Sequence, residues 1–252
     1  MANLTYYGHS AFQVETNGTH ILIDPFLTGN PAAKTSAEDV PADYILVTHG
    51  HGDHIGDTVA IAERTGAVAV CNAEIARWLG KQGVETHAMH IGGGYPFPFG
   101  YVKLTQALHG SPLPDGSYGG NPGGFLLKLA EGKTLYFAGD TGLFGDMRLI
   151  GDEGLDLAVL PIGDNFTMGP DDALKAVELL RPKAVLPMHY DTCAVIEQDV
   201  HAWKAQVGAE TDAEVVLLSV DGSAEIWADR FCEPAHRMIR GVWLKKHINF
   251  TN

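Results

Sequence analysis

Residues 48–54 read THGHGDH, which places three histidines and one aspartate within seven positions. Imidazole nitrogen and carboxylate oxygen are ligands for Zn²⁺ and also for Mn²⁺, Fe²⁺, Co²⁺ or Ni²⁺, whereas Ca²⁺ and Mg²⁺ prefer oxygen donors. As a plain surface turn the stretch would only crowd imidazoles that repel one another when protonated. The sequence therefore predicts a transition-metal site whose first ligands are His49, His51, Asp53 and His54.

Three further polar residues each follow an apolar, strand-like run directly, at the place where side chains converge at the mouth of a sheet. Taken singly, a histidine in such a position is more often an ordinary hydrogen-bonded residue than a metal ligand. Beside the metal-binding stretch, all three become candidate ligands. The expected arrangement has His49, His51 and His109 on a first metal, Asp53, His54 and His189 on a second, and Asp140 as a bridge.

Two cations that share a water lower its pKa from 15.7 to about 7, which makes a hydroxide nucleophile available at neutral pH. That chemistry predicts hydrolysis of an ester, a lactone or a phosphoester. Asp53 and His9 are the candidate catalytic residues, with His9 in GHSAF as proton donor to the leaving group. The alternative for His9 is a structural histidine that ties down a loop.

Two other stretches have two interpretations each. Asp24 in LIDPF either anchors a metal-binding histidine or caps the turn at Pro25. Residues 163–170, GDNFTMGP, line the pocket through Asp164, Asn165 and Met168, or simply form a helix entry with its N-cap near Thr167 or Gly169. Both interpretations of this second stretch can hold together.

The elements that must position these residues alternate between strand-like and helix-like patterns. Strands are expected over 4–7, 11–14, 20–24, 44–49, 68–71, 101–108, 124–129, 134–139, 156–162, 184–190, 214–220 and 224–228. Helices are expected over 57–64, 73–81, from Pro170 to Pro182, and over about 195–207. The mixture predicts a layered α/β fold with sheets inside and helices outside. The glycine-rich stretches 91–100 and 109–124 are expected to be surface loops.

Composition narrows the class of partner. The 252 residues, 45% of them hydrophobic, are enough for a sizeable core, and the formal net charge of −14 opposes nucleic acid as a substrate. No apolar run approaches the ~18 residues that a membrane span needs, and the N-terminal stretch lacks a signal-peptide pattern, so we expect a cytoplasmic protein with no membrane partner. Three scattered cysteines predict neither a disulfide scaffold nor a thiolate zinc cage. The expected partner is a small-molecule substrate, and a homo-oligomer is left open.

The last residues differ from the rest of the chain. Residues 229–252 carry five Lys and Arg against two Asp and Glu, which reverses the sign of the charge. We interpret them as a basic C-terminal extension, either a docking tail or a disordered or non-native segment, and residues 1–228 as the folded domain.

HGHGDH, with the later His109, Asp140 and His189, resembles the metallo-β-lactamase superfamily pattern HxHxDH…H…D…H. More narrowly, YYGHSAF, ILIDPFL, FAGDTGLF and PMHYDT look like the uncharacterised metal-dependent hydrolases related to L-ascorbate-6-phosphate lactonase. The resemblance covers residues 1–228. It implies an αββα four-layer sandwich with a dinuclear centre, most simply zinc, at one edge, and the ligand roles given above.

Three other functions are compatible with such a fold. A β-lactamase is disfavoured because the chain has no secretion signal. A di-iron redox protein would usually carry acidic ligands in place of some histidines and pair with a flavin domain. An RNA-processing nuclease is opposed by the net charge.

Overall fold

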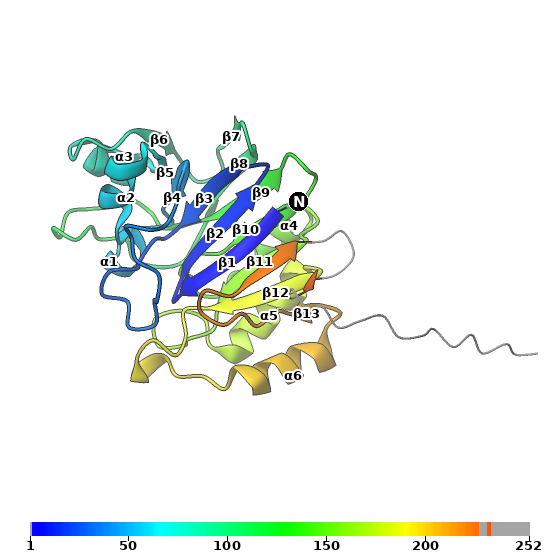
Figure 1. Ribbon diagram of the computed structural model, residues 1–252. Helices are drawn as coiled ribbons and strands as arrows, with labels where there is room; N and C mark the ends of the chain where they lie inside the picture. Colours follow the sequence, from blue (N-terminus) through cyan, green and yellow to red (C-terminus); the bar gives the residue numbers. More distant parts are fainter. Residues whose placement is uncertain (1, 227–230, 233–252) are drawn as a thin grey trace, which may run out of the picture.

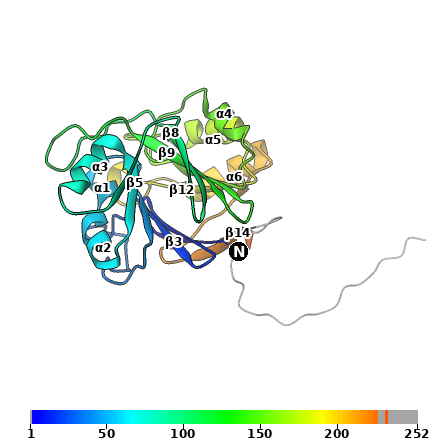
Figure 2. The ribbon, with the colours of Figure 1, turned by 90° about the horizontal axis from the view of Figure 1, so that it is seen from above.

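The computed structural model describes residues 2–226 and 231–232. Within them, two mixed sheets pack face to face with helices on both outer faces (Figures 1 and 2). This arrangement confirms the predicted α/β class and the αββα order of layers. Among the helices described, none has the length and apolar character needed to cross a membrane.

The first sheet has eight strands. In spatial order they are β15 (Phe231–Cys232), β14 (Ser223–Ile226), β1 (Ala2–Gly8), β2 (Ala11–Thr16), β3 (Thr19–Ile23), β4 (Tyr44–Leu46), β5 (Val68–Asn72) and β6 (Thr86–Met89). Strands β3 to β6 run parallel to one another, whereas β14, β1, β2 and β3 pair antiparallel. Helices α1 (Gly52–Ile55), α2 (Thr58–Thr65) and α3 (Ala73–Gly80) lie on its side of the sandwich (Figure 2).

The second sheet has seven strands. In spatial order they are β13 (Glu214–Val215), β12 (Ala184–Met188), β11 (Leu157–Pro161), β10 (Thr134–Phe137), β9 (Gly123–Leu129), β8 (Gly100–Gln106) and β7 (Gly94–Phe97). Strands β10 to β13 are parallel, and β7 to β10 are antiparallel. Helices α4 (Met147–Gly151), α5 (Pro170–Leu180) and α6 (Val200–Glu210) lie on the outer side of this sheet, and a short 3₁₀ helix, η1 (Ala194–Ile196), follows β12.

The main core lies between the two sheets, and each outer helical layer adds an apolar cluster of its own. Phe12 of β2 and Phe137 of β10 meet across the sheet interface with ring centroids 5.8 Å apart, and both are buried. On the outside, Trp203 of α6 is buried and its Nε1 donates to Pro170 O at the start of α5, 3.1 Å away. The central strands β9 to β12 are thus buried on both faces, which explains their nearly continuous apolar runs.

The local signals at helix ends agree with the structure. Helix α5 has Pro170 in its first turn with Asp171 and Asp172, and Gly169 is its N-cap, as one interpretation of residues 163–170 expected. Helix α3 begins where the Asn72 side chain accepts a hydrogen bond from Ile75 N, 2.9 Å away.

Some element predictions were wrong. The stretch 91–100 is not wholly a loop, because Gly94–Phe97 form edge strand β7 against β8, where Pro96 is tolerated. The helix expected over 195–207 is divided: η1 ends at Ile196, and α6 starts after Asp199, whose side chain caps Ala202 N. Strand β6 and helices α1 and α4 were missed. Of the predicted C-terminal extension, Phe231–Cys232 pair with β14, and the rest lies outside the described residues.

The contact between Phe12 and Phe137 yields a prediction for stability. Phe12→Ala removes a fully buried ring between the sheets, and we expect the free energy of unfolding to fall by about 3–5 kcal/mol in urea titrations followed by circular dichroism. Tyr118→Ala is the control, because Tyr118 is 69% exposed; its effect is expected within about 0.5 kcal/mol. Equal effects of the two substitutions would contradict this account of the core.

Candidate metal centre

The candidate ligands come from both sheets and meet at one edge. His49 and His51 follow β4, and Asp53 and His54 lie in α1. His109 follows β8, Asp140 follows β10 and His189 follows β12 directly, so the second sheet supplies the other three. Because the parallel strands of each sheet end at the same edge, their following segments converge there. The structure brings all seven predicted residues together.

The donor atoms form groups compatible with metal binding. His49, His51 and His109 offer ring nitrogens that lie within 4.8 Å of one another, which matches the first predicted set. A second group contains the predicted Asp53, His54 and His189 and adds His9, again within 4.8 Å.

Asp140 lies between the two groups. Its Oδ2 is 3.0 Å from His189 Nε2 and 3.3 Å from His54 Nε2 on one side. On the other side it is 3.5 Å from His109 Nε2 and 4.0 Å from His49 Nε2. This single carboxylate therefore lies close to ring nitrogens of both groups.

Asp53 and His9 form the more open side of the cluster. The Asp53 side chain is 39% exposed, and its Oδ2 accepts a hydrogen bond from His9 Nε2 over 3.1 Å. His9 Nδ1 lies 2.6 Å from Thr192 Oγ1. Since Nε2 donates to a carboxylate, Nδ1 is the acceptor in the neutral ring and the threonine hydroxyl donates. His9 is buried in the turn between β1 and β2 and contacts the cluster directly.

Asp24 anchors the metal-binding stretch, as the first interpretation of this residue predicted. Its Oδ2 accepts from His54 Nδ1 at 2.8 Å and from Thr48 Oγ1 at 2.7 Å, while Oδ1 accepts from Thr48 N at 2.8 Å. Because the Thr48 hydroxyl donates its hydrogen to Asp24, its oxygen accepts a hydrogen bond from His49 Nδ1, 3.0 Å away. Both His49 and His54 are thereby fixed in the tautomer whose Nε2 lone pair faces the cluster.

Buried polar atoms in the cluster lack partners among the described residues. His54 Nε2, Asp140 Oδ1 and His189 Nδ1 have no hydrogen-bond partner there. Such atoms cost free energy unless something satisfies them. A cation at the centre would satisfy His54 Nε2, and it would also compensate the carboxylates of Asp24 and Asp140, which are almost fully buried. The residues present fit a divalent transition metal.

The pKa shifts agree with this fit. Burial lowers the pKa of His49, and it is also the main cause of the lower pKa of His51 and His109, so these rings are neutral and able to bind a metal. For His54 and His189, burial acts in the same direction, but neighbouring carboxylates together outweigh it. Asp140 and Asp24 raise the pKa of His54 well above its usual value, and Asp140 and Asp53 raise that of His189 to about 9. The carboxylates thus attract positive charge, which bound metal would supply.

Three residues of the site have unusual backbone conformations. His9, Asp24 and His189 adopt positive φ angles of 57°, 45° and 54°. Few residues other than glycine occupy this region, and asparagine, aspartate and histidine are the commonest exceptions. Strain of this kind is typical of functional sites, where the fold fixes the direction of a side chain.

The sequence analysis missed several supporting residues. Thr48 and Thr192 bind ring nitrogens of His49 and His9, and the Thr141 hydroxyl accepts from Leu108 N, 2.9 Å away. Each of these threonines is one to three residues from a candidate ligand, and that proximity was the only signal. Of the residues expected to line the pocket, Met168 is instead buried in the apolar cluster around α5, because this cluster needs a large side chain there.

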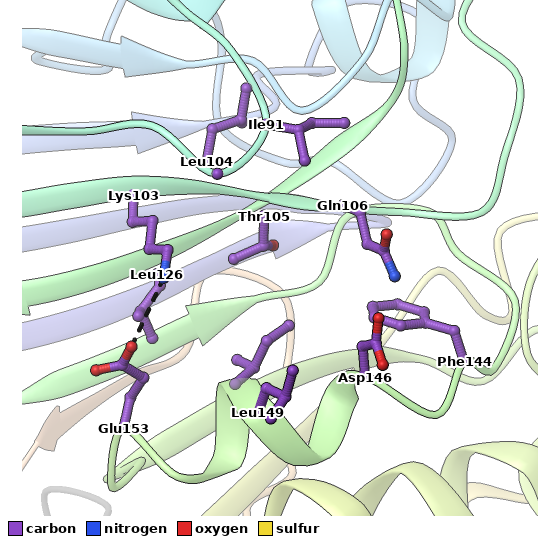
Figure 3. Close-up of a pocket in the computed structure, with 12 residues that line it drawn as sticks. Ile91, Lys103, Leu104, Thr105, Gln106, Leu126, Phe144, Asp146, Leu149 and Glu153 are labelled. Atoms are coloured by element: carbon purple, nitrogen blue, oxygen red, sulfur yellow. Dashed lines mark ion pairs between the residues drawn. The ribbon is translucent and has the colours of Figure 1, made fainter.

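A largely apolar pocket of about 180 Å³ lies between β8 and α4 (Figure 3). Gln106, Phe144 and Asp146 stand at one end of it, and Lys103 and Glu153 form an ion pair of 3.7 Å at the other. Gln106 is three residues before His109, and Phe144 is four residues after Asp140. One end of the pocket is therefore formed by the segments that carry these two candidate ligands.

The chain is similar to known proteins along most of its length. Residues 19–190 match the family described as "Beta-lactamase superfamily domain". A "UPF0173 metal-dependent hydrolase" of Pelotomaculum thermopropionicum is 54% identical over 228 residues, which cover 88% of this chain and 99% of that protein.

Solved structures extend the comparison. Igni18, described as a novel metallo hydrolase from Ignicoccus hospitalis, is 39% identical, with a TM-score of 0.81 over 88% of this chain and 97% of that one. CmlA of Streptomyces venezuelae, a diiron beta-hydroxylase, is 17% identical with a TM-score of 0.65 over 92% of this chain and 54% of that one, which shows a shared fold alone. Together with the two-sheet sandwich and the His/Asp cluster, these matches show that the chain belongs to the beta-lactamase superfamily, among its metal-dependent hydrolases.

Proposed function

We propose that this metal-dependent hydrolase cleaves an ester, lactone or phosphoester bond of a small molecule with two divalent transition-metal ions, most simply Zn²⁺. The observation that carries the proposal is the position of Asp140 Oδ2, within 4.0 Å of ring nitrogens from both ligand groups. The proposed catalytic domain spans residues 1–228.

Seven residues would hold the two ions. His49, His51 and His109 form the first set, Asp53, His54 and His189 form the second, and Asp140 is shared. When bound, the ions would activate a water at neutral pH and polarise the substrate oxygen. Mn²⁺, Fe²⁺, Co²⁺ and Ni²⁺ suit the same donors as Zn²⁺.

The remaining tasks belong to side chains of the chain itself. Asp24 and Thr48 keep the Nε2 atoms of His49 and His54 directed at the centre. His9 holds a proton on Nε2 against the Asp53 carboxylate, at the open side of the cluster. In the proposed mechanism this proton passes to the leaving group, and Asp53 orients the ring that donates it.

The ligand set predicts how metal content responds to substitution. After reconstitution with Zn²⁺ or Mn²⁺, we expect about two metal ions per chain, measured by elemental mass spectrometry of the purified protein. His109→Ala removes one member of the first set and is expected to lower the metal content to about one ion per chain. Asp140→Ala removes the shared ligand, so we expect weaker binding at both positions and a fall of about 10²-fold or more in the hydrolysis of model esters. His201→Ala, on the exposed face of α6, is the control. Full metal content and activity in Asp140→Ala would contradict the proposal.

Asp24→Asn tests the anchoring of His54. Asparagine tolerates the positive φ at this position, so the backbone is preserved while the charge is lost. We expect metal affinity, measured by competition with a chelator, to fall by about 10–100-fold. Unchanged affinity would mean that the Asp24 carboxylate does not support the centre.

His9→Asn tests proton donation at the leaving group, again with a residue that accepts positive φ. The loss in kcat/KM is expected to reach about 10²–10⁴-fold for alkyl esters, whose leaving groups need a proton, and to be small for p-nitrophenyl esters, whose leaving group does not. Thr192→Val is the matched variant, because it removes only the partner of His9 Nδ1. Equal losses on both ester types would indicate that His9 only ties down its turn.

A further inference from the structure

The segments that surround the metal centre carry many more acidic than basic side chains. These segments are 8–10, 24–43, 48–57, 107–122, 138–146, 162–169 and 189–199. Apart from the candidate ligands and Asp24, they carry one lysine, Lys34, no arginine, and ten acidic residues: Glu38, Asp39, Asp43, Asp57, Asp115, Asp146, Asp164, Asp191, Glu197 and Asp199. The segments around the centre are thus strongly negative, and their own sequence offers a single cationic side chain that could pair with an anionic group of a substrate.

Six of the twelve lysines and arginines among the described residues form ion pairs away from these segments. Their ion pairs with carboxylates join β8, β9 and α4, or lie at the ends of α5 and of β10 and β12: Lys103 and Lys128 with Glu153, Lys133 and Lys183 with Asp156, Lys175 with Asp172, and Arg181 with Asp152. The carboxylates around the centre would therefore repel a substrate with a phosphate or carboxylate group, except where bound metal ions compensate their charge.

Exposed apolar side chains occur on three of these segments. Leu108 is 53% exposed, Phe166 55% and Val195 59%. Large apolar side chains that gather around a site, rather than scatter, mark a surface for an apolar ligand.

Backbone contacts tie these three segments to the centre. Gly142 N donates to Leu108 O and Met168 N donates to Thr141 O, both over 3.0 Å, so the segments of Leu108 and Phe166 join the one that carries Asp140. Val195 is three residues beyond Thr192, the partner of His9.

We infer that the substrate is an uncharged ester with an apolar group that packs against Leu108, Phe166 and Val195. This inference rests on the proposed hydrolase function and narrows it. Carboxylic esters, lactones and neutral phosphotriesters belong to the class, whereas phosphate monoesters and diesters and esters with a free carboxylate do not.

Two p-nitrophenyl esters of similar size test the charge preference of the metal-loaded full-length chain. p-Nitrophenyl butyrate is neutral, and p-nitrophenyl monosuccinate carries a carboxylate at the end of its acyl chain. We expect kcat/KM, divided by the rate with hydroxide alone, to be at least about tenfold higher for the butyrate at low salt. The ratio is expected to shrink as ionic strength rises, since salt screens exposed charges.

A lysine placed on a segment around the centre should change this preference. Phe166→Lys is expected to lower the ratio by about three- to tenfold, through faster turnover of the succinate and slower turnover of the butyrate. Val195→Lys is the second variant, in case the first perturbs its loop. Tyr95→Lys is the control, because Tyr95 is 46% exposed on β7 and pairs with Val102 near the start of β8, whereas His109 follows the end of that strand.

The outcomes separate the inference from the function on which it rests. If the metal-loaded chain hydrolyses neither ester, nor a phosphotriester, nor a lactone, the proposed function fails. If it hydrolyses the succinate or p-nitrophenyl phosphate at least as fast as the butyrate, the function stands and the inference is overturned. The inference is also overturned if Phe166→Lys and Val195→Lys change the ratio of butyrate to succinate turnover no more than Tyr95→Lys does.

Discussion

The site depends on a buried carboxylate surrounded by imidazole rings. Asp140 is 2% exposed, and one of its oxygens lies within 4.0 Å of four ring nitrogens. A carboxylate taken out of water is costly unless positive charge compensates it. Protons on His54 and His189 are one source of that charge, and metal ions are the other. The demand for a cation is thus built into the burial of Asp140, and the rest of the cluster is arranged around it.

The fold meets this demand through its strand ends. Parallel strands in both sheets finish at one edge, and the candidate ligands lie in the segments that follow these strands. The backbone then aims the side chains: His9, Asp24 and His189 take left-handed conformations that the packed core enforces. Gly56 serves the same purpose, because a Cβ there would overlap the Pro25 backbone, so the end of α1 could not approach the segment that carries Asp24. The two-sheet sandwich thus positions the side chains of the candidate metal centre, and a few residues at its edge supply the donor atoms.

Much of this could be predicted from the sequence. The density of imidazoles in THGHGDH indicated metal binding, and the lone polar residues after apolar runs identified His109, Asp140 and His189 as their spatial neighbours. Thr48 and Thr192 could not be found in this way, because a hydroxyl that fixes a histidine tautomer has no sequence pattern. The short elements β6, β7, α1 and α4 were missed because four or five residues carry too little periodicity. Their existence depends on tertiary pairing.

The division of the candidate ligands between the two sheets also has a consequence for how metal would be acquired during synthesis of the chain. The first 54 residues carry His49, His51, Asp53 and His54, but Asp140 emerges 86 residues after His54, and His189 later still. If the residues hold two ions as proposed, the first set would be complete once Asp140 has joined the second sheet, and the second set only once His189 has followed β12 into it. Once the last of these residues has arrived, each bound ion would link segments from opposite halves of the chain, so that loading the centre and closing the sandwich become a single thermodynamic event.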